Sequence, residues 1–518
     1  MSARDGDAAV RESYEQVPYP SALQHHTHPD RLAMLALLHG MEPAAPQRCR
    51  VLELGCADGG NIIPMAIELR ESELTGIDLS PRQIESGKAQ AAAWELQNVN
   101  LRTMSIMDVG PDFGTFDYII AHGVFSWVTP EVQEQILAVC RRNLAPQGIA
   151  YISYNTYPGW HLRRMVRDMV LFHTRDVTDP EEQAARAFDL VRFLAGTTGD
   201  ANDAHALFLR SAHEHFEEYA DRPHYLMHEY LERTNAPLYS SEFASRAARH
   251  GLQYVCEAAP HEAEVDNLPG AIAAKLHSYT SNALELEQYL DFVVNRAFRR
   301  TLLTHSAVTL DRAMRVDRMR RLFASSAAKP VDADVDTRPG MPAAFTNEQG
   351  KTFTSTHPVA KRVLAHLAAI WPRAASFEEA ARAGGDEEVT ADLLYALFWS
   401  GVAELHMTPP DCTNVVSARP RAALLARRQA DAGVLVTNQR GRVLKLDDAF
   451  ARFILRQLDG TNDRASLVRL LDHEVAAGRL DVRVDEQPVR DPARIPAVLQ
   501  AILDHHLKKM AEYALLVG

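Results

Sequence analysis

Carboxylates and glycines that could hold a nucleoside gather around residue 55. Residues 50–61 read Arg-Val-Leu-Glu-Leu-Gly-Cys-Ala-Asp-Gly-Gly-Asn. The apolar run that ends at Leu54 predicts a buried parallel strand, and Gly55 predicts a tight turn after it. The glycines leave room for a ligand beside the backbone, and a helix predicted over 62–69 begins there with free N–H groups. This stretch is the candidate binding loop.

Two further acids follow at intervals that suit the same ligand. Asp78 lies on a predicted second strand within 74–80, where a carboxylate can accept hydrogen bonds from both ribose hydroxyls. A third strand is predicted over 103–108 and ends at Asp108. The alternative interpretation is a tight turn with two surface acids in an ordinary α/β fold. The combination of glycines and acids favours ligand binding.

Glu53 narrows the choice of ligand. The spacing from Gly55 to Gly60 is not the G-x-G-x-x-G of a pyrophosphate binder, and a carboxylate at Glu53 would be unfavourable beside a diphosphate. It suits instead a cofactor with an amino group and a sulfonium. The stretch therefore resembles motif I of class I S-adenosylmethionine-dependent methyltransferases. One departure is Ala57, where many members have glycine, because alanine accommodates only a negative φ comfortably.

The resemblance implies a role for each motif residue. Glu53, Gly55 and Gly59 would bind the methionine part of S-adenosyl-L-methionine. Asp78 would bind the ribose, and Asp108 would accept the adenine amino group. The full set of cofactor-binding candidates is Glu53, Gly55, Cys56, Ala57, Gly59, Asn61, Asp78, Leu79, Met107, Asp108 and His122.

The acceptor of the methyl group should approach the same edge of the sheet. Strands are predicted over 116–122 and 149–154, and ligands of open parallel sheets lie beyond the carboxyl ends of the strands. Aromatic faces there could stabilise a methylated ammonium, and an amide could orient the nitrogen. The catalytic candidates are His122, Tyr154, Asn155, Tyr157 and Trp160, with Tyr14 and Tyr19 from an N-terminal arm, and Trp127 as additional lining.

Two of these assignments have alternatives. His122 alone among them has a solution pKa suited to a general base, but its ring could instead cap a neighbouring carbonyl. Tyr14 and Tyr19 could close over the cofactor or acceptor, or belong to a packed aromatic arm. His228-Glu229 is followed by Glu232 where a zinc protease has a second histidine, so we predict no metal site.

Bulk composition excludes several classes of protein. A chain of 518 residues with 46% apolar and 24% charged residues predicts about three soluble globular domains. Five scattered cysteines without a C-x-x-C pair predict reduced thiols in a cytoplasm. A net charge of −13 disfavours nucleic acid as the main partner. No apolar run suits a signal peptide or membrane insertion, so we expect a cytoplasmic protein.

Several later motifs make the resemblance more specific. Residues 154–161, 228–232 and 251–254 are similar to bacterial methyltransferases that carry a methyltransferase regulatory domain. That group includes the rickettsial outer-membrane-protein lysine methyltransferases. A cluster of arginines between 296 and 321 could dock an acidic partner, but we interpret it as solvated helix faces.

The expected fold is α/β, a Rossmann-like class I methyltransferase sheet with a helical insertion and mainly helical, winged-helix-like C-terminal domains. The expected parts are a methyltransferase core with an N-terminal cap (1–160), a helical insertion for a lid or dimerisation (161–235), the remainder of the sheet with the regulatory region (236–323), a helical middle domain (345–415) and a C-terminal domain (416–518).

Three functions follow from these patterns. The first is a protein-lysine N-methyltransferase that acts by direct in-line methyl transfer on a protein or peptide. Such an enzyme could form a homodimer. The second is a small-molecule O- or N-methyltransferase. The third is a non-catalytic scaffold or regulator that binds the cofactor as a ligand.

Overall fold

The computed structural model describes residues 15, 21–262, 264–347, 350, 352–484, 487–489, 491 and 494–518. Tyr14 and Tyr19, two of the predicted site residues, lie outside this part of the chain. The chain forms two compact units. Unit 1 holds residues 1–22 and 41–310, and unit 2 holds residues 23–40 and 311–518.

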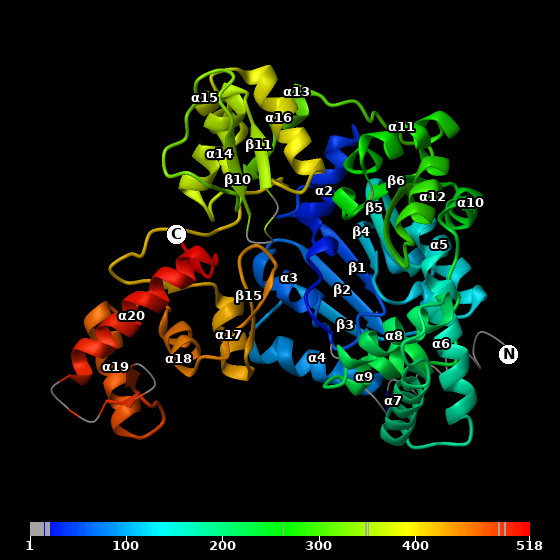
Figure 1. The fold of residues 1–518 in the computed structure, drawn as a ribbon, viewed down its shortest axis with the longest axis horizontal. Coiled ribbons are helices and arrows are strands. Elements are labelled where there is room, and N and C mark those ends of the chain that lie inside the picture. Colours follow the sequence, from blue (N-terminus) through cyan, green and yellow to red (C-terminus); the bar gives the residue numbers. More distant parts are fainter. Residues whose placement is uncertain are drawn as a thin grey trace. The chain divides into compact units, whose positions relative to one another are not determined.

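Unit 1 is built on a seven-stranded sheet of order β3-β2-β1-β4-β5-β7-β6 (Figure 1). Strands β1 to β5 are parallel, whereas β7 runs antiparallel to both of its neighbours. The order reverses between β1 and β4, and ligands of such sheets bind beyond the carboxyl ends of the strands at that reversal. The predicted α/β sheet is confirmed. The strands are β1 (Arg50–Leu54), β2 (Glu73–Asp78), β3 (Val99–Thr103), β4 (Phe116–Ala121), β5 (Leu144–Asn155), β6 (Leu252–Glu257) and β7 (Phe298–His305).

Helices pack on the sheet through their apolar faces, and capping residues determine where the helices begin. Ser80 caps the helix that follows β2 by accepting a hydrogen bond from the Gln83 N–H, and Pro81 occupies its first position. The central strands bury Ile119 and Ile152 completely, so the core lies between them and the helices. The covering helices are α3 (Ile62–Glu68), α4 (Pro81–Ala93), α5 (Pro130–Asn143) and α10 (Ser240–Arg249).

The third strand ends earlier than we predicted. Strand β3 pairs with β2 only as far as Thr103, which lies opposite Asp78, the last residue of β2. Beyond that point Ser105 accepts a hydrogen bond from the Met107 N–H and starts a 3-10 helix, Ile106–Asp108. The prediction of a strand over 103–108 was therefore wrong, because the partner strand runs out before Asp108.

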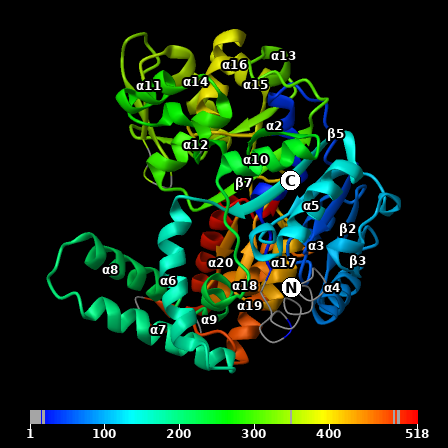
Figure 2. The same ribbon diagram turned by 90° about the vertical axis from the view of Figure 1, so that its right-hand side faces the viewer.

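Helices occupy the segments between the last strands. A helical arm extends between β5 and β6, with α6 leading to the hairpin of α7 and α8 (Figure 2). The arm has a small core of its own, which includes Val170, Val191 and Phe216. Two further helices lie between β6 and β7. These elements are α6 (Gly159–Thr174), α7 (Pro180–Gly196), α8 (Ala204–Glu217), α9 (Pro223–Leu226), a π-helical turn (Met227–Leu231), α11 (Gly270–Tyr279) and α12 (Ala283–Val294).

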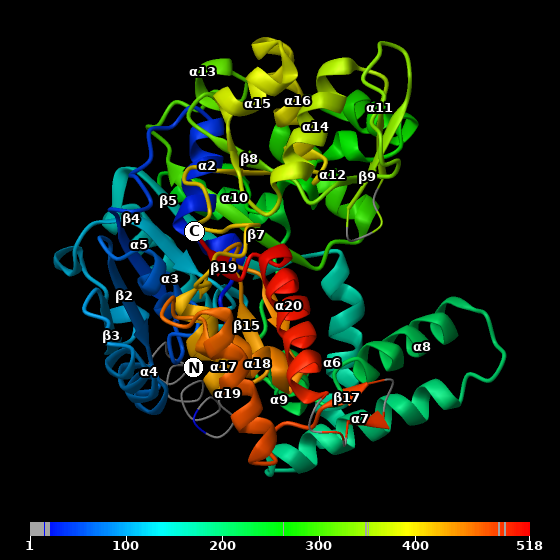
Figure 3. The same ribbon diagram turned by 90° about the vertical axis from the view of Figure 1, so that its left-hand side faces the viewer.

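Unit 2 combines a middle part with a C-terminal helical part (Figure 3). The N-terminal helix α2 (Pro29–Leu38) packs within it, since Arg31 lies over the Phe398 ring and the Thr408 N–H donates to Asp30. The other elements are α13 (Val316–Met319), β8 (Phe323–Ser325), β9 (Lys329–Pro330), β10 (Ala343–Thr346), β11 (Thr352–Ser355), α14 (Pro358–Ile370), β12 (Ala375–Ser376), α15 (Phe377–Gly384), α16 (Glu387–Trp399), β13 (Glu404–His406), β14 (Arg421–Ala422), α17 (Leu424–Ala432), β15 (Leu435–Thr437), β16 (Val443–Lys445), α18 (Ala449–Gln457), α19 (Arg464–Ala476), β17 (Arg483–Val484), β18 (Gln487–Pro488), α20 (Ile495–Glu512) and β19 (Leu516–Val517).

Strands β15 and β16 form an antiparallel hairpin, and Asp463 caps α19 by accepting a hydrogen bond from the Ser466 N–H. Within the described ranges of the chain, no helix has the length and apolar character needed to cross a bilayer.

Candidate active site

The loop between β1 and α3 is fixed to the end of β2 by its backbone. The N–H groups of Gly55 and Cys56 both donate to the Ile77 carbonyl, at 2.8 and 3.0 Å. Gly55 has a φ of 72°, and a Cβ on it would lie 2.4 Å from Cγ2 of Val124, so only glycine fits. The loop therefore has one tightly determined path at the carboxyl edge of the sheet.

Ala57 adopts the left-handed conformation that we did not expect of an alanine. Its φ is 51°, in the region where many members of the motif family place glycine. The Ala57 N–H donates to Oδ2 of Asp78 at 2.9 Å, and this bond holds the strained residue in place. The loop thus keeps its glycine-like shape without a glycine at this position.

Glu53 is a buried carboxylate with one satisfied oxygen. Asn61 donates to its Oε1 at 2.7 Å, while Oε2 has no hydrogen-bond partner among the described residues. Burial raises the pKa of Glu53 to about 8, although the bond from Asn61 opposes this, and the nearby Asp78 carboxylate raises it further. A buried acid with an orphaned oxygen is costly, and a cationic ligand would offset the cost.

Asp78 stands at the end of β2 beside the same loop. The Ser80 N–H donates to its Oδ1 and the Ala57 N–H to its Oδ2, each at 2.9 Å. Burial raises the pKa of Asp78, against the lowering effect of these backbone bonds. Each oxygen can accept a second hydrogen bond, so the carboxylate can still take two hydroxyl donors.

Ser21 is a loop contact that sequence reasoning missed. Its Oγ accepts a hydrogen bond from the Gly60 N–H at 2.7 Å and donates to Oδ1 of Asp58. A Cβ on Gly60 would lie 2.3 Å from the Ser21 carbonyl oxygen, so the second of the paired glycines admits the N-terminal segment rather than a ligand. The glycine pair was the only signal of this contact, and it did not indicate which segment approaches.

Met107 and Asp108 lie on the 3-10 turn after β3 and are exposed. The Met104 N–H donates to the Asp78 carbonyl at 2.9 Å, which keeps this turn at the same edge of the sheet as Asp78. The structure thus brings Asp108 to the expected edge, though from a turn rather than a strand.

His122 follows β4 and forms a pair with a buried tyrosine. Its Nδ1 lies 3.0 Å from the hydroxyl of Tyr151, and its ring lies edge-on to Phe298. Burial, with a smaller effect from Arg300, lowers the pKa of His122 to about 4. The imidazole is therefore neutral at pH 7 and holds a proton weakly.

Asn155, Trp127 and Trp160 come together beyond β5. The Asn155 N–H donates to Oγ of Ser126 at 2.8 Å, and the Trp127 and Trp160 rings are T-shaped with centroids 5.9 Å apart. Both the Asn155 Nδ2 and the Trp160 Nε1 are buried without an acceptor among the described residues. Unpaired buried donors are uncommon and mark this corner as a place for a polar ligand group.

Tyr154 and Tyr157 each stack on another aromatic ring. Tyr154 is buried in the sheet core, where it stacks on Phe243 with ring centroids 4.2 Å apart. Tyr157 stacks on His161 at 4.1 Å and lies 5.2 Å from Tyr239. Consecutive residues of a strand point to opposite faces, so Tyr154 and Asn155 cannot line the same site.

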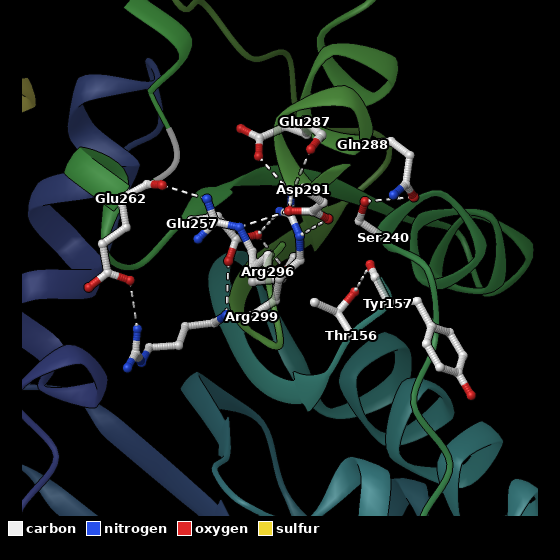
Figure 4. A network of polar contacts seen from close by, with 12 residues as sticks. Thr156, Tyr157, Ser240, Glu257, Glu262, Glu287, Gln288, Asp291, Arg296 and Arg299 are labelled. Atoms are coloured by element: carbon white, nitrogen blue, oxygen red, sulfur yellow. Dashed lines mark hydrogen bonds and ion pairs between the residues drawn. The ribbon is translucent and has the colours of Figure 1, made fainter. Parts of the chain in front are cut away.

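A buried arginine on β7 bonds carboxylates of β6 and α12 (Figure 4). Arg299 on β7 lies opposite Tyr154 on β5. It donates to Glu257 at 2.8 Å, to Glu287 at 2.9 Å and to Asp291 at 2.8 Å. The interpretation of the arginine cluster as solvated faces was wrong for Arg299, which is 2% exposed.

In the parts of the chain that are described, no three histidine, cysteine, aspartate or glutamate side chains gather closely enough to hold a metal ion.

Three family models match separate parts of the chain. Residues 52–150 match a methyltransferase domain, residues 222–305 a predicted methyltransferase regulatory domain, and residues 418–515 the C-terminal winged helix domain of PKMT. The first match covers the glycine loop and Asp78, and the second covers β6, β7 and the buried Arg299.

One similar protein and one solved structure extend over nearly the whole chain, and a second similar protein covers less than half of it. An uncharacterized protein of Rickettsia prowazekii (strain Madrid E) is 30% identical over 99% of this chain and 95% of its own length. A second from the same organism is 37% identical over 46% of this chain and 94% of its own. The solved structure of PKMT2 from Rickettsia typhi in complex with AdoHcy has a TM-score of 0.86 and 28% identity, and covers 97% of this chain and 100% of that one. The chain therefore belongs to this family of S-adenosylmethionine-dependent methyltransferases, in which a methyltransferase domain, a regulatory domain and a PKMT-type winged helix domain follow one another.

Proposed function

We propose that this methyltransferase transfers methyl groups to lysine side chains of a protein substrate. The neighbour from Rickettsia typhi is named as a PKMT and was solved with AdoHcy, the demethylated form of the methyl donor. The similarity to that neighbour covers 97% of this chain and 100% of the neighbour, and residues 418–515 match the C-terminal winged helix domain of PKMT. We also propose the domain limits expected from the sequence, 1–160, 161–235, 236–323, 345–415 and 416–518, together with a cytoplasmic location and a homodimer.

The residues of the glycine loop fit S-adenosylmethionine. The unpaired Oε2 of Glu53 is the observation that carries the assignment, because an ammonium would complete its hydrogen bonding and ionise it. The free acceptor positions of Asp78 suit two ribose hydroxyls, and Asp108 is exposed at the edge where an adenine amino group would lie. The proposed set is Glu53, Gly55, Cys56, Ala57, Gly59, Asn61, Asp78, Leu79, Met107, Asp108 and His122.

When bound, the sulfonium supplies an activated methyl group. The chain therefore needs to position the acceptor and exclude water, and does not need to supply an acid or a metal. We propose that Asn155 orients the acceptor nitrogen, with the Trp127 ring and the Tyr157 ring beside it. The Trp160 ring would support the Trp127 ring through their edge-on contact, and Tyr154 would support β5 from the core. Aromatic faces would stabilise the methylated ammonium as it forms.

The acceptor lysine must lose a proton before it can attack. A pKa of about 4 makes His122 a poor acceptor for a proton from an ammonium group. We therefore propose that His122, held by Tyr151, shapes the site, and that burial of the lysine lowers the lysine pKa enough for its proton to pass to water.

Calorimetric titration with S-adenosylhomocysteine tests the cofactor site. Asp78→Ala should abolish measurable binding, whereas the exposed Asp112→Ala on a neighbouring turn should leave it intact. Unchanged affinity in Asp78→Ala would refute the assignment. Mass spectrometry after incubation with methyl-labelled cofactor and cell extract tests the acceptor: label on protein lysines supports the proposal, and label confined to small molecules contradicts it.

A further inference from the structure

Three buried N–H groups beyond β4 and β5 lack an acceptor among the residues that the structure describes. They are Nδ2 of Asn155, Nε1 of Trp160 and Nδ2 of Asn235. Asn155 is 4% exposed and Trp160 is completely buried. A buried donor without a partner costs free energy, and native proteins contain few of them. Three in one region would indicate that a ligand completes their hydrogen bonding.

Ser126 and the residue after it connect these three side chains. The Asn155 N–H donates to Oγ of Ser126 at 2.8 Å, and the backbone N–H that follows Asn235 donates to the Ser126 carbonyl at 2.8 Å. The ring of Trp127 lies edge-on to the ring of Trp160, with centroids 5.9 Å apart. We call Asn155, Trp160 and Asn235 the donor corner.

The segment that contains Asn235 is fixed before any ligand binds. The Leu238 N–H donates to the Asn155 carbonyl at 3.1 Å, and Oγ1 of Thr156 donates to the Leu238 carbonyl at 2.7 Å. Residues 222–305 match the regulatory domain, so that domain supplies Asn235 to the end of β5. Groups held in this way lose little conformational entropy when a ligand binds.

A lysine side chain alone does not satisfy the donor corner. An ammonium has donors and no acceptor, and an indole N–H can only donate. The carboxamides of Asn155 and Asn235 can present either oxygen or nitrogen, but Nε1 of Trp160 needs an acceptor in every case. An N–H directed at the Trp127 ring would gain only a weak interaction. The ligand should therefore bring an oxygen in addition to the lysine nitrogen.

Carboxylates offset the charges of the two least exposed arginines of α6. Arg163 lies over the Trp160 ring, but it donates to Glu229 at 2.6 Å. Arg167 has an unpaired Nη1 one turn further along the helix, and the carboxylates of Glu232 and Glu229 act on it. A carboxylate placed among the neutral donors would add a buried charge, whereas a carbonyl would not. The charges of the described residues thus favour a neutral carbonyl oxygen.

We propose that Trp160 and Asn235 donate hydrogen bonds to a main-chain carbonyl oxygen of the substrate beside the acceptor lysine, while Asn155 orients the lysine nitrogen. Asn235 is then a substrate-binding residue that the regulatory domain contributes to the acceptor site. This inference rests on the proposed protein substrate.

Three small acceptors separate binding of the oxygen from binding of the amine. Nα-acetyl-lysine N-methylamide has peptide carbonyls beside the lysine, Nα-acetyl-lysine has a free carboxylate, and n-pentylamine has only the amine. Methyl transfer from labelled cofactor to each acceptor is measured with the full chain, and the values of kcat/KM are compared.

The test variants change Asn235 alone. Asn235→Asp replaces the N–H donor by an acceptor at nearly constant size, and Asn235→Leu removes hydrogen bonding altogether. The matched control is Asn202→Asp, at an exposed asparagine before α8. All three should keep the melting temperature and the affinity for S-adenosylhomocysteine of the wild type, because neither position belongs to the glycine loop.

We expect the wild type to prefer the methylamide to pentylamine at least about tenfold in kcat/KM, as hydrogen bonds to buried donors imply. Both Asn235 variants should lose most of this preference through a lower kcat/KM for the methylamide, and the control should keep it. Equal losses with both acceptors would indicate a structural role for Asn235 and overturn the proposal. A preference for the free acid would identify a carboxylate site and also overturn it.

The proposed activity can fail separately. Label on protein lysines of a cell extract, with no difference between methylamide and pentylamine, would keep the proposed function and overturn the role of the donor corner. A preference for the methylamide that depends on Asn235, without label on protein lysines, would support the donor corner and contradict the protein substrate.

Discussion

Replacing the buried Glu53 by glutamine should stabilise the free protein and weaken its cofactor binding. The two effects have opposite signs because they concern the two protonation states of one carboxyl group. Glutamine keeps the shape of the side chain and can still accept the hydrogen bond from Asn61, so the substitution changes charge with little change in packing.

The size of the stability effect follows from the pKa. The pKa of Glu53 is about 8 in the folded chain, against an ordinary value of 4.5. Below pH 4.5 the group is protonated in both folded and unfolded chains and costs nothing. As the pH rises from 4.5 to 8, only the unfolded chain ionises freely, so the free energy of unfolding falls by about 1.4 kcal/mol per pH unit. The loss reaches on the order of 5 kcal/mol above pH 8.

Chemical denaturation at a series of pH values measures this loss. Glu53→Gln and the wild type should have similar stabilities at pH 4.5, and the variant should become increasingly more stable up to pH 8. Asp117→Asn is a suitable control, because that side chain is on the same sheet but at its opposite, amino-terminal end.

Cofactor binding supplies the opposite half of the test. At pH 7 the free wild type holds a proton on Glu53, and an ammonium ligand should drive it off. Calorimetry with S-adenosylhomocysteine in two buffers of different ionisation enthalpy should detect close to one proton released by the wild type and none by Glu53→Gln, with weaker binding in the variant. A stability difference that does not change with pH, together with unaltered affinity, would refute the reasoning.

Three other substitutions test the surroundings of the site. Gly60→Ala places a methyl group 2.3 Å from the Ser21 carbonyl oxygen and should weaken binding of S-adenosylhomocysteine about tenfold by calorimetry; normal affinity would show that the N-terminal segment moves away freely. Ala57→Gly relieves a φ of 51° and should raise the free energy of unfolding by about 1 kcal/mol, whereas a lower melting temperature would contradict the assigned strain. Arg299→Met leaves buried carboxylates unpaired and should cost about 3–5 kcal/mol in denaturant unfolding, a prediction that a loss below 1 kcal/mol would exclude.

The sequence predicted the strands and the glycine loop because their signals are local. The short apolar run that ends before Gly55 determines a strand and a turn from neighbouring residues alone. The end of β3 has no such signal. Residues 103–108 are compatible with a strand, but pairing requires a partner, and β2 ends opposite Thr103.

The positions of the site residues also depend on packing that local sequence signals do not determine. Tyr154 and Asn155 are adjacent in the sequence, and both residue types suit an acceptor site. Both faces of β5 are buried, and only the packing of α10 places Tyr154 against Phe243, on the face opposite to that of Asn155. Ser21 reaches Gly60 across 39 residues, a distance over which sequence spacing carries no information.

The burial of Arg299 likewise follows from the order of the strands and not from its neighbours in the sequence. Along the sequence it is one of several arginines, but β7 inserts between β5 and β6, so its side chain is buried and must find carboxylates from other elements. Those carboxylates come from β6 and α12, which belong with β7 to the segment that matches the regulatory domain. That segment therefore supplies two strands of the sheet and the arginine network that joins β6, β7 and α12. Its removal would expose the edge of β5, so the segment that matches the regulatory domain is an integral part of the sheet.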